Sequence, residues 1–232
     1  MLSKCITLKS IDFISFETDQ FFNIKAMFEE CNELEYLNLS NFNTINVSDI
    51  GWMFNECHKL KEIKGIENFN TIKVSKMNGM FQECNGLEYL NFSNFNTINF
   101  SDMGLMFNKF HKLRIIKGIE NFNTIKVTNM NSMFQECNEL ENLNLSNFNT
   151  INLNDMEWMH NNSCSLKEIK GINMFNTINV KSMKAMFKGC KTLQYLHLCN
   201  FNITNISDME RLFAQCHKLK EIKGINYLIH LK

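Results

Sequence analysis

Thiol and imidazole groups are the side chains of this 232-residue sequence that could act as nucleophile, base or metal ligand, and the chain has nine cysteines and six histidines. Two dipeptides, Cys57-His58 and Cys216-His217, place one group beside the other, as in a cysteine nucleophile with its base. Adjacent helical residues do not face each other, however, and the dipeptide recurs in phase with a longer pattern. Catalytic groups are normally unique, so we interpret these pairs as repeat positions and predict that the chain is not an enzyme.

The segment from His160 to Cys164 is a second candidate for chemistry, because the residues His-Asn-Asn-Ser-Cys break the pattern there. A catalytic site added to the fold would have to lie in this segment, since no phosphate-binding loop, HExxH motif or Ser-His-Asp arrangement stands out elsewhere. We interpret the segment as a decayed repeat or a local bulge.

The cysteines follow a regular spacing of about one per repeat. Seven share one column, namely Cys5, Cys31, Cys57, Cys84, Cys137, Cys190 and Cys216, while Phe110 and Ser163 fill its other places, Cys164 slips by one and Cys199 lies elsewhere. Zinc sites use ligand pairs two to four residues apart, and no C-x-x-C occurs. The spacing predicts free, buried thiols in a reducing compartment, with no metal site and no cofactor, although oxidation could still join neighbouring coils.

A repeat of 26 or 27 residues positions these groups. Its marker is Met-Phe, which begins at residues 27, 53, 80, 106, 133 and 186, with Met159-His160 and Leu212-Phe213 as variants. Within a unit, one apolar set has helical spacing (Ile50, Met53, Phe54, Cys57 and Leu60) and another alternates as in a strand (Leu34, Leu37 and Leu39). A polar residue such as Ser48 or Ser75 precedes each helical set, where a helix N-cap is expected.

This period is typical of leucine-rich repeats. We predict an α/β fold, a right-handed leucine-rich-repeat solenoid with a parallel β-sheet on the concave face, short helices on the convex face and about nine strands. Residues 1–232 form a single domain, and residues 1–16 are a partial first repeat. Stacked coils should align phenylalanines into two buried columns, one from the Met-Phe pairs and one through Phe42 and Phe69, with a ladder of asparagines beside the second.

The repeat resembles the BspA-type leucine-rich repeat. The string Met-Phe-x-x-Cys-x-x-Leu-x-x-Leu-x-Leu-Ser-Asn-Phe-Asn-Thr, followed by x-x-Val-Ser-x-Met, carries the resemblance, at residues 27–47 and again at 133–153. Members of that family are similar to bacterial surface proteins and mycoplasma lipoproteins, and most act as adhesins or are uncharacterised. The resemblance implies binding to proteins. This chain departs from the family pattern because it alternates a short repeat type with one that is a residue longer.

The outward positions of the strands form three columns. Charge alternates along the first, through Lys9, Glu35, Lys61, Glu88, Arg114, Glu141 and Lys167. This alternation favours a self-neutralised ladder that holds the register, with a binding role as the alternative. The other two columns interleave tyrosines with lysines that recur on every second strand. In the lysine column, which begins at Asp12, no lysine has an acidic partner on a neighbouring strand. We predict that this stripe binds another protein with acidic groups, a solvated face being the alternative, and its candidate residues are Tyr36, Lys64, Tyr89, Lys117, Lys170, Tyr195 and Lys223.

Composition excludes several other classes. The formal net charge is zero, so we expect no nucleic-acid partner, and no segment approaches the roughly 20 apolar residues of a membrane span, so we expect no membrane insertion. The N-terminus lacks a signal-peptide pattern, which favours the cytoplasm, with the cell surface as the alternative for a fragment of an exported protein. The runner-up function is a structural scaffold that assembles end to end through residues 1–16 and the apolar segment from Tyr227 to Leu231.

Overall fold

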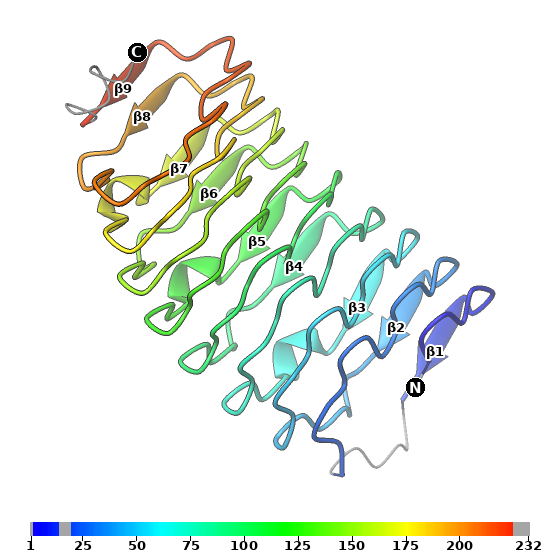
Figure 1. Ribbon diagram of the computed structural model, residues 1–232. Coiled ribbons are helices and arrows are strands. Elements are labelled where there is room, and N and C mark those ends of the chain that lie inside the picture. The colour runs from blue at the N-terminus through cyan, green and yellow to red at the C-terminus, as the bar shows by residue number, and fades with distance from the viewer. Residues whose placement is uncertain (1, 14–19, 225–232) are drawn as a thin grey trace.

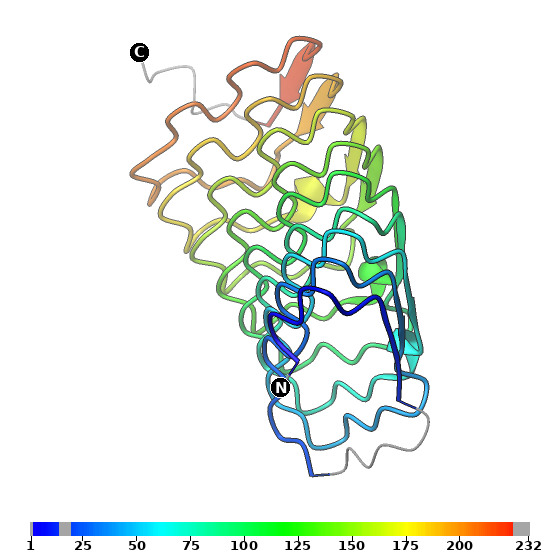
Figure 2. The same ribbon diagram turned by 90° about the vertical axis from the view of Figure 1, so that its right-hand side faces the viewer.

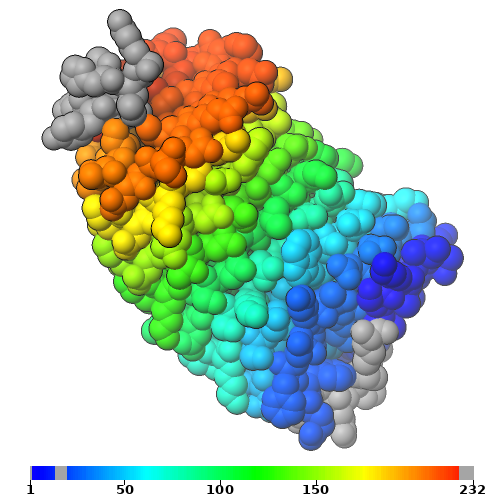
Figure 3. All heavy atoms as spheres, in the orientation of Figure 1, coloured from blue at the N-terminus to red at the C-terminus, as the bar shows by residue number. Residues whose placement is uncertain are grey.

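The computed structural model describes residues 2–13 and 20–224 and shows a stack of coils, each with one short strand (Figure 1). The strands of the described part are Ser10–Asp12 (β1), Tyr36–Asn38 (β2), Glu62–Lys64 (β3), Tyr89–Asn91 (β4), Ile115–Lys117 (β5), Asn142–Asn144 (β6), Glu168–Lys170 (β7), Tyr195–His197 (β8) and Glu221–Lys223 (β9). They lie along one side of the stack (Figure 2), and consecutive coils form successive bands of an elongated body (Figure 3). The predicted parallel-strand repeat solenoid is confirmed. Phe16 and the segment from Tyr227 to Leu231 lie outside the described residues.

Hydrogen-bonded strands are parallel and offset by one repeat. Leu37 at the centre of β2 lies between Ile11 of β1 and Ile63 of β3, and the residues on either side of each strand centre point outward. The ladder is interrupted within the described residues. One sheet contains β1, β2 and β3, and β4–β5, β6–β7 and β8–β9 form separate pairs.

Each interruption follows a coil of the longer type. The strand of such a coil ends at a glycine with φ between 85° and 87°, and a single 3-10 turn comes next, at Ile66–Asn68 (η1), Ile119–Asn121 (η2) and Ile172–Met174 (η3). A Cβ atom on Gly118 would lie 2.4 Å from the backbone nitrogen of Ser93 in the preceding coil, so this position requires glycine. The extra residue is therefore taken up by a turn that packs against the previous coil, and the next strand starts a new ladder.

The prediction of α-helices on the other side of the coils is wrong. Residues 50–57 and their equivalents are turns. Left-handed residues recur four positions apart, as at Trp52 (φ 59°) and Glu56 (φ 58°), whereas an α-helix needs φ near roughly −63° throughout. The backbone N–H groups donate to the next coil, as Phe54 does to the Met80 carbonyl at 2.9 Å. Paired turns of about four residues thus reproduce the apolar spacing of a helix without its hydrogen bonds.

Polar residues of the turns also join neighbouring coils. Ser75, expected as a helix N-cap, donates its backbone N–H to the preceding coil. Thr71 Oγ1 donates to the Asn96 carbonyl at 2.9 Å and accepts from the Asn96 N–H at 2.8 Å. The asparagines of the expected ladder act within their own coil instead, as when Asn70 Oδ1 accepts from the Ile72 N–H. The bridge between coils is therefore made by threonine, and asparagine shapes the turn.

The two predicted phenylalanine columns are confirmed. In the first, the rings of Phe28 and Phe54 stack with centroids 5.7 Å apart and planes 5° apart. In the second, Phe148 and Phe175 stack at 6.4 Å and 3°. These columns run through the buried core from coil to coil, so each coil covers the apolar face of its neighbour.

Candidate functional site

The strand face, meaning the outward side chains of β1–β9 together with the residue before each strand, carries the predicted charge ladder in its first column. Lys61 Nζ donates to Glu35 Oε2 at 2.6 Å, and Lys167 pairs with Glu141 at 2.7 Å. The hydrogen bond from Lys61 lowers the pKa of the Glu35 carboxyl below its ordinary value. Each of these cations lies on a longer-type coil and pairs with the glutamate of the coil before it, which is the self-neutralised arrangement expected from the sequence.

The lysine row, defined as Lys64, Lys117 and Lys170, lies at the end of alternate strands. All three side chains are exposed, and none has a carboxylate oxygen within 4.0 Å among the residues that the structure describes. Lys223 differs, because its Nζ lies 3.5 Å from Glu221 Oε1. The structure therefore places three of the four predicted lysines on alternate strands, exposed and without an ion-pair partner among the described residues.

The predicted tyrosines lie on β2, β4 and β8, which alternate with the strands that carry the lysines. Tyr89 is 48% exposed and Tyr195 is 53% exposed, whereas Tyr36 is partly buried. Lys220 Nζ lies 5.9 Å from the centroid of the Tyr195 ring, within the range of a cation–π contact. Large aromatic surfaces of this kind act as anchors in protein interfaces. The second and third columns thus combine aromatic and cationic groups on one face.

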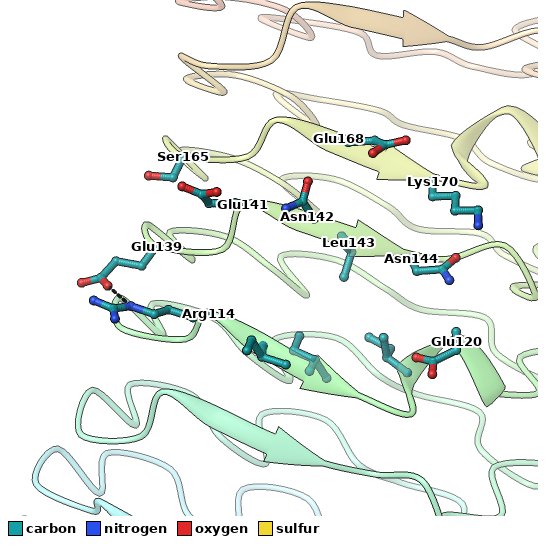
Figure 4. Close-up of a pocket in the computed structure, with 13 residues that line it drawn as sticks. Arg114, Glu120, Glu139, Glu141, Asn142, Leu143, Asn144, Ser165, Glu168 and Lys170 are labelled. Atoms are coloured by element: carbon teal, nitrogen blue, oxygen red, sulfur yellow. Dashed lines mark hydrogen bonds and ion pairs between the residues drawn. The ribbon is translucent and has the colours of Figure 1, made fainter.

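Sequence reasoning missed the grooves that open where the strand ladder is interrupted. The central groove lies between β5 and β6, has a volume of about 770 Å³ and is lined by Ile115, Ile116, Asn142 and Leu143 among others (Figure 4). Residues of β3 and β4 line two hollows of about 490 and 260 Å³, and residues of β7 and β8 line one of about 580 Å³. The signal in the sequence was the extra residue of every second repeat, together with Ile115 and Asn142 as exceptions in the second column.

The cysteine column has a structural role in the described coils. Cys57 Sγ lies 3.1 Å from the Phe28 carbonyl oxygen of the preceding coil, and burial raises the pKa of its thiol well above the ordinary value. His58 turns away to the next coil, where its Nδ1 lies 3.0 Å from the Glu83 carbonyl oxygen. The thiol and the imidazole therefore each bond to backbone, and the geometry gives no activated nucleophile. The described residues contain no group of three or more His, Cys, Asp or Glu side chains arranged to hold a metal ion.

The irregular segment keeps the columns of the other coils. His160 is fully buried in the first phenylalanine column, and Ser163 Oγ donates to the Phe134 carbonyl at 2.6 Å, as a cysteine thiol does elsewhere. Burial lowers the pKa of His160 to about 3. The segment is thus a repeat with substituted residues, in which the imidazole is neutral and remote from solvent.

Comparisons with solved structures agree with this architecture. A leucine-rich repeat protein from T. pallidum has a TM-score of 0.50 at 16% identity, over 79% of this chain and 77% of that one. A leucine-rich cell surface protein from Faecalibacterium prausnitzii (TM-score 0.37, 13% identity, 95% and 68% covered) and a leucine-rich repeat protein from Bacteroides ovatus (TM-score 0.25, 18% identity, 95% and 79% covered) are also similar. No curated protein sequence matches the chain.

Two further findings bear on the class of protein. No helix in the described ranges has the length and apolar character that crossing a bilayer would require. A family model described as a Mycoplasma protein of unknown function, DUF285, matches residues 1–116 and 108–226, and this agrees with the BspA-type resemblance of the repeats. Since the two matches together span nearly the whole sequence, the chain belongs to the DUF285 family of leucine-rich repeat proteins.

Proposed function

We propose that the chain is a non-catalytic protein-binding module that uses its strand face to contact a partner with acidic groups. The observation that carries the proposal is the contrast between two sets of cations. Lys61 and Lys167 are paired with glutamates, whereas the lysine row is exposed and has no carboxylate within 4.0 Å among the described residues. Cations without an internal partner are available to attract an acidic surface and to orient it.

The tyrosines supply the apolar part of the same surface. Tyr89 and Tyr195 each expose about half of the side chain. Their rings can lose water on contact with a partner at a low cost in side-chain entropy, while the lysine row fixes the orientation of that partner. The expected interface is therefore flat, mixed aromatic and basic, and spread over several coils.

The test replaces the lysine row by glutamate, as Lys64→Glu, Lys117→Glu and Lys170→Glu in one variant. The matched control reverses the same number of charges in the turns away from the strands, with Lys73→Glu, Lys126→Glu and Lys181→Glu. Partners captured from the native source by wild-type protein are identified by mass spectrometry, and their affinities for both variants are then measured. At least tenfold weaker binding is expected for the first variant and little change for the control. Unchanged capture by the first variant would contradict the proposal.

End-to-end self-assembly is the second candidate. The side chain of Ile6 in the first coil is 57% exposed, and the coil of β1 has no strand on its other side among the described residues. An open strand edge can pair with another chain. Sedimentation velocity over a hundredfold dilution separates the two candidates, because a mass that does not change with concentration would exclude assembly.

The compartment is a separate part of the proposal. Seven cysteines that share one column of the coils favour a reducing compartment, which points to the cytoplasm, and the cell surface is the alternative. Labelling of intact cells with a membrane-impermeant amine reagent, followed by recovery of the protein, tests this directly. Labelling before lysis would place the protein at the surface.

A further inference from the structure

The central groove differs from its counterparts at two positions of the repeat. Asn142 stands where β4 and β8 have Tyr89 and Tyr195, and Ile115 stands where β3 and β7 have glutamate. Tyr89 lines both of the separate hollows between β3 and β4, of about 490 and 260 Å³, and Tyr195 lines the hollow of about 580 Å³ beside β7 and β8. Asn142, which is shorter than tyrosine, lines the central groove of about 770 Å³. The central groove is therefore larger than each of these three hollows, and it has room for a side chain from another molecule.

The floor and wall of the central groove are apolar. Ile116 and Leu143 form its base at 8% and 3% exposure, and Ile115 rises beside them with 57% of its side chain exposed. Covering an exposed isoleucine at the edge of a hollow with another apolar group removes apolar surface from water, which is favourable. The first requirement for an occupant is thus an apolar side chain.

The charges around the groove set the second requirement. Its lining contains four glutamates against Arg114 and Lys170, a formal charge of −2. Arg114 already binds Glu139, with its Nε 2.7 Å from Glu139 Oε2, and Glu141 binds Lys167. Glu120 and Glu168 have no cation within 4.0 Å among the described residues (Figure 4). An occupant that carries a positive charge would pair with these two carboxylates.

We propose that the central groove binds an extended segment of a partner protein, with an apolar side chain over Ile115 and a lysine or arginine beside it that reaches Glu168 or Glu120. The exposed amide of Asn142 and the nearby amide of Asn144 line the same groove and can bond to the backbone of such a segment. This inference rests on the proposed function, because it names one contact of the same partner. Lys170 belongs both to the lysine row and to the lining of the groove. Lys64 and Lys117 lie outside that lining and would meet acidic groups of the partner, whereas Glu120 and Glu168 would meet a basic one.

Most of the substitutions for the test are taken from the equivalent positions of other coils. Asn142→Tyr and Ile115→Glu introduce residues that other coils hold at the same positions, so both variants should fold, which thermal unfolding will verify. Tyr89→Asn is the matched control, since it makes the reverse change at the interruption between β3 and β4. Glu168→Gln removes one of the two free carboxylates without changing the size of the side chain.

A random heptapeptide display library is the probe. It is selected on the wild-type protein and counter-selected on the Asn142→Tyr variant, and the enriched peptides are synthesised for affinity measurement. The expected peptides have an apolar residue within two positions of a lysine or arginine. They should bind Asn142→Tyr and Ile115→Glu at least tenfold more weakly than wild type and Glu168→Gln about threefold more weakly, with Tyr89→Asn unchanged.

Three results would overturn the inference. One is that no peptide is enriched, and another is that enriched basic peptides bind Asn142→Tyr as well as wild type. The third is enrichment of acidic peptides that lose affinity in a Lys64→Glu, Lys117→Glu variant, which leaves Lys170 of the groove lining unchanged. That result would support the proposed function and contradict the groove. Conversely, groove peptides that behave as expected, together with unchanged partner capture by the Lys64→Glu, Lys117→Glu variant, would support the groove and contradict the acidic partner.

Discussion

His160 is stacked on Phe134, with ring centroids 5.5 Å apart and planes 2° apart, and Phe187 packs on its other side at 5.6 Å. Neither ring nitrogen of His160 has a hydrogen-bond partner in the described structure. An imidazole thus fills a place that phenylalanine fills in most other coils, and it can do so only while neutral. This relationship makes the stability of the protein depend on pH.

The first prediction concerns that dependence. Burial lowers the pKa of His160 to about 3. Between about pH 6.5 and pH 3 this imidazole is therefore protonated in the unfolded chain and neutral in the folded one. The stability is therefore complete above about pH 6.5 and falls by about 1.4 kcal/mol per pH unit as the pH drops from there toward 3. In His160→Phe this contribution should disappear. Denaturant unfolding at pH 7, 6, 5 and 4 measures the difference between the two proteins, and parallel pH profiles would contradict the assignment.

A second prediction concerns the glycine that begins the 3-10 turn after β5. Gly118→Ala should destabilise the protein by about 3 kcal/mol or more, because the left-handed backbone disfavours alanine and the new methyl group would meet backbone atoms of Ser93. Gly51→Ala is the control, since Gly51 has no positive φ and the closest atom to its added Cβ is 3.0 Å away on the flexible side chain of Asn78. Thermal unfolding of both variants gives the comparison, and similar losses would show that the turn geometry is not the cause.

The threonine bridge between coils gives a third prediction. Thr71 is buried and both donates to and accepts from the backbone of Asn96. Thr71→Val keeps the shape but removes the partner of two partly buried backbone groups, the N–H and C=O of Asn96, so a loss of about 1–2 kcal/mol is expected. Thr71→Ser retains the hydroxyl and should lose less. Chemical denaturation ranks the two variants, and an equal loss would mean that the hydroxyl contributes nothing to the joint between coils.

A fourth prediction concerns the thiols. Cys199 is exposed, whereas Cys57 and Cys84 are buried with pKa values raised by that burial, so the folded protein should react first at Cys199. Titration with a disulfide reagent should give nine reactive thiols after denaturation, which is the number of cysteines in the chain. Cys199→Ser should remove the fast phase. A denatured count below nine would reveal a disulfide between coils.

The sequence was sufficient to predict the columns, because a fixed period aligns like residues whatever path the chain takes between them. Leu37 beside Ile63 and Phe28 beside Phe54 follow from the 26-residue offset alone. The helices were predicted wrongly for a local reason. Trp52 and Glu56 adopt left-handed conformations that side chains of their type rarely signal, and the resulting turns have nearly the apolar spacing of a helix.

The lysines of the candidate site could be predicted from the sequence, but its grooves could not. Period and alternation were enough to place Lys64, Lys117 and Lys170 on the outward face. The grooves depend on how the extra residue after Gly118 bends the backbone and ends the ladder, which is a property of three-dimensional packing. For that reason the sequence shows Ile115 and Asn142 only as two exceptions in the second column, and the structure is needed to show that both line a groove.

The left-handed glycines Gly65, Gly118, Gly171 and Gly224 recur every 53 residues, and each closes a coil of the longer type. The chain is therefore modular in pairs of coils and not in single ones. Removing one coil would place two strands of the same type side by side and break the alternation of paired and available lysines. Removing or adding two would shorten or lengthen the molecule and keep every remaining groove intact, so relatives and engineered variants of different length should differ by multiples of 53 residues.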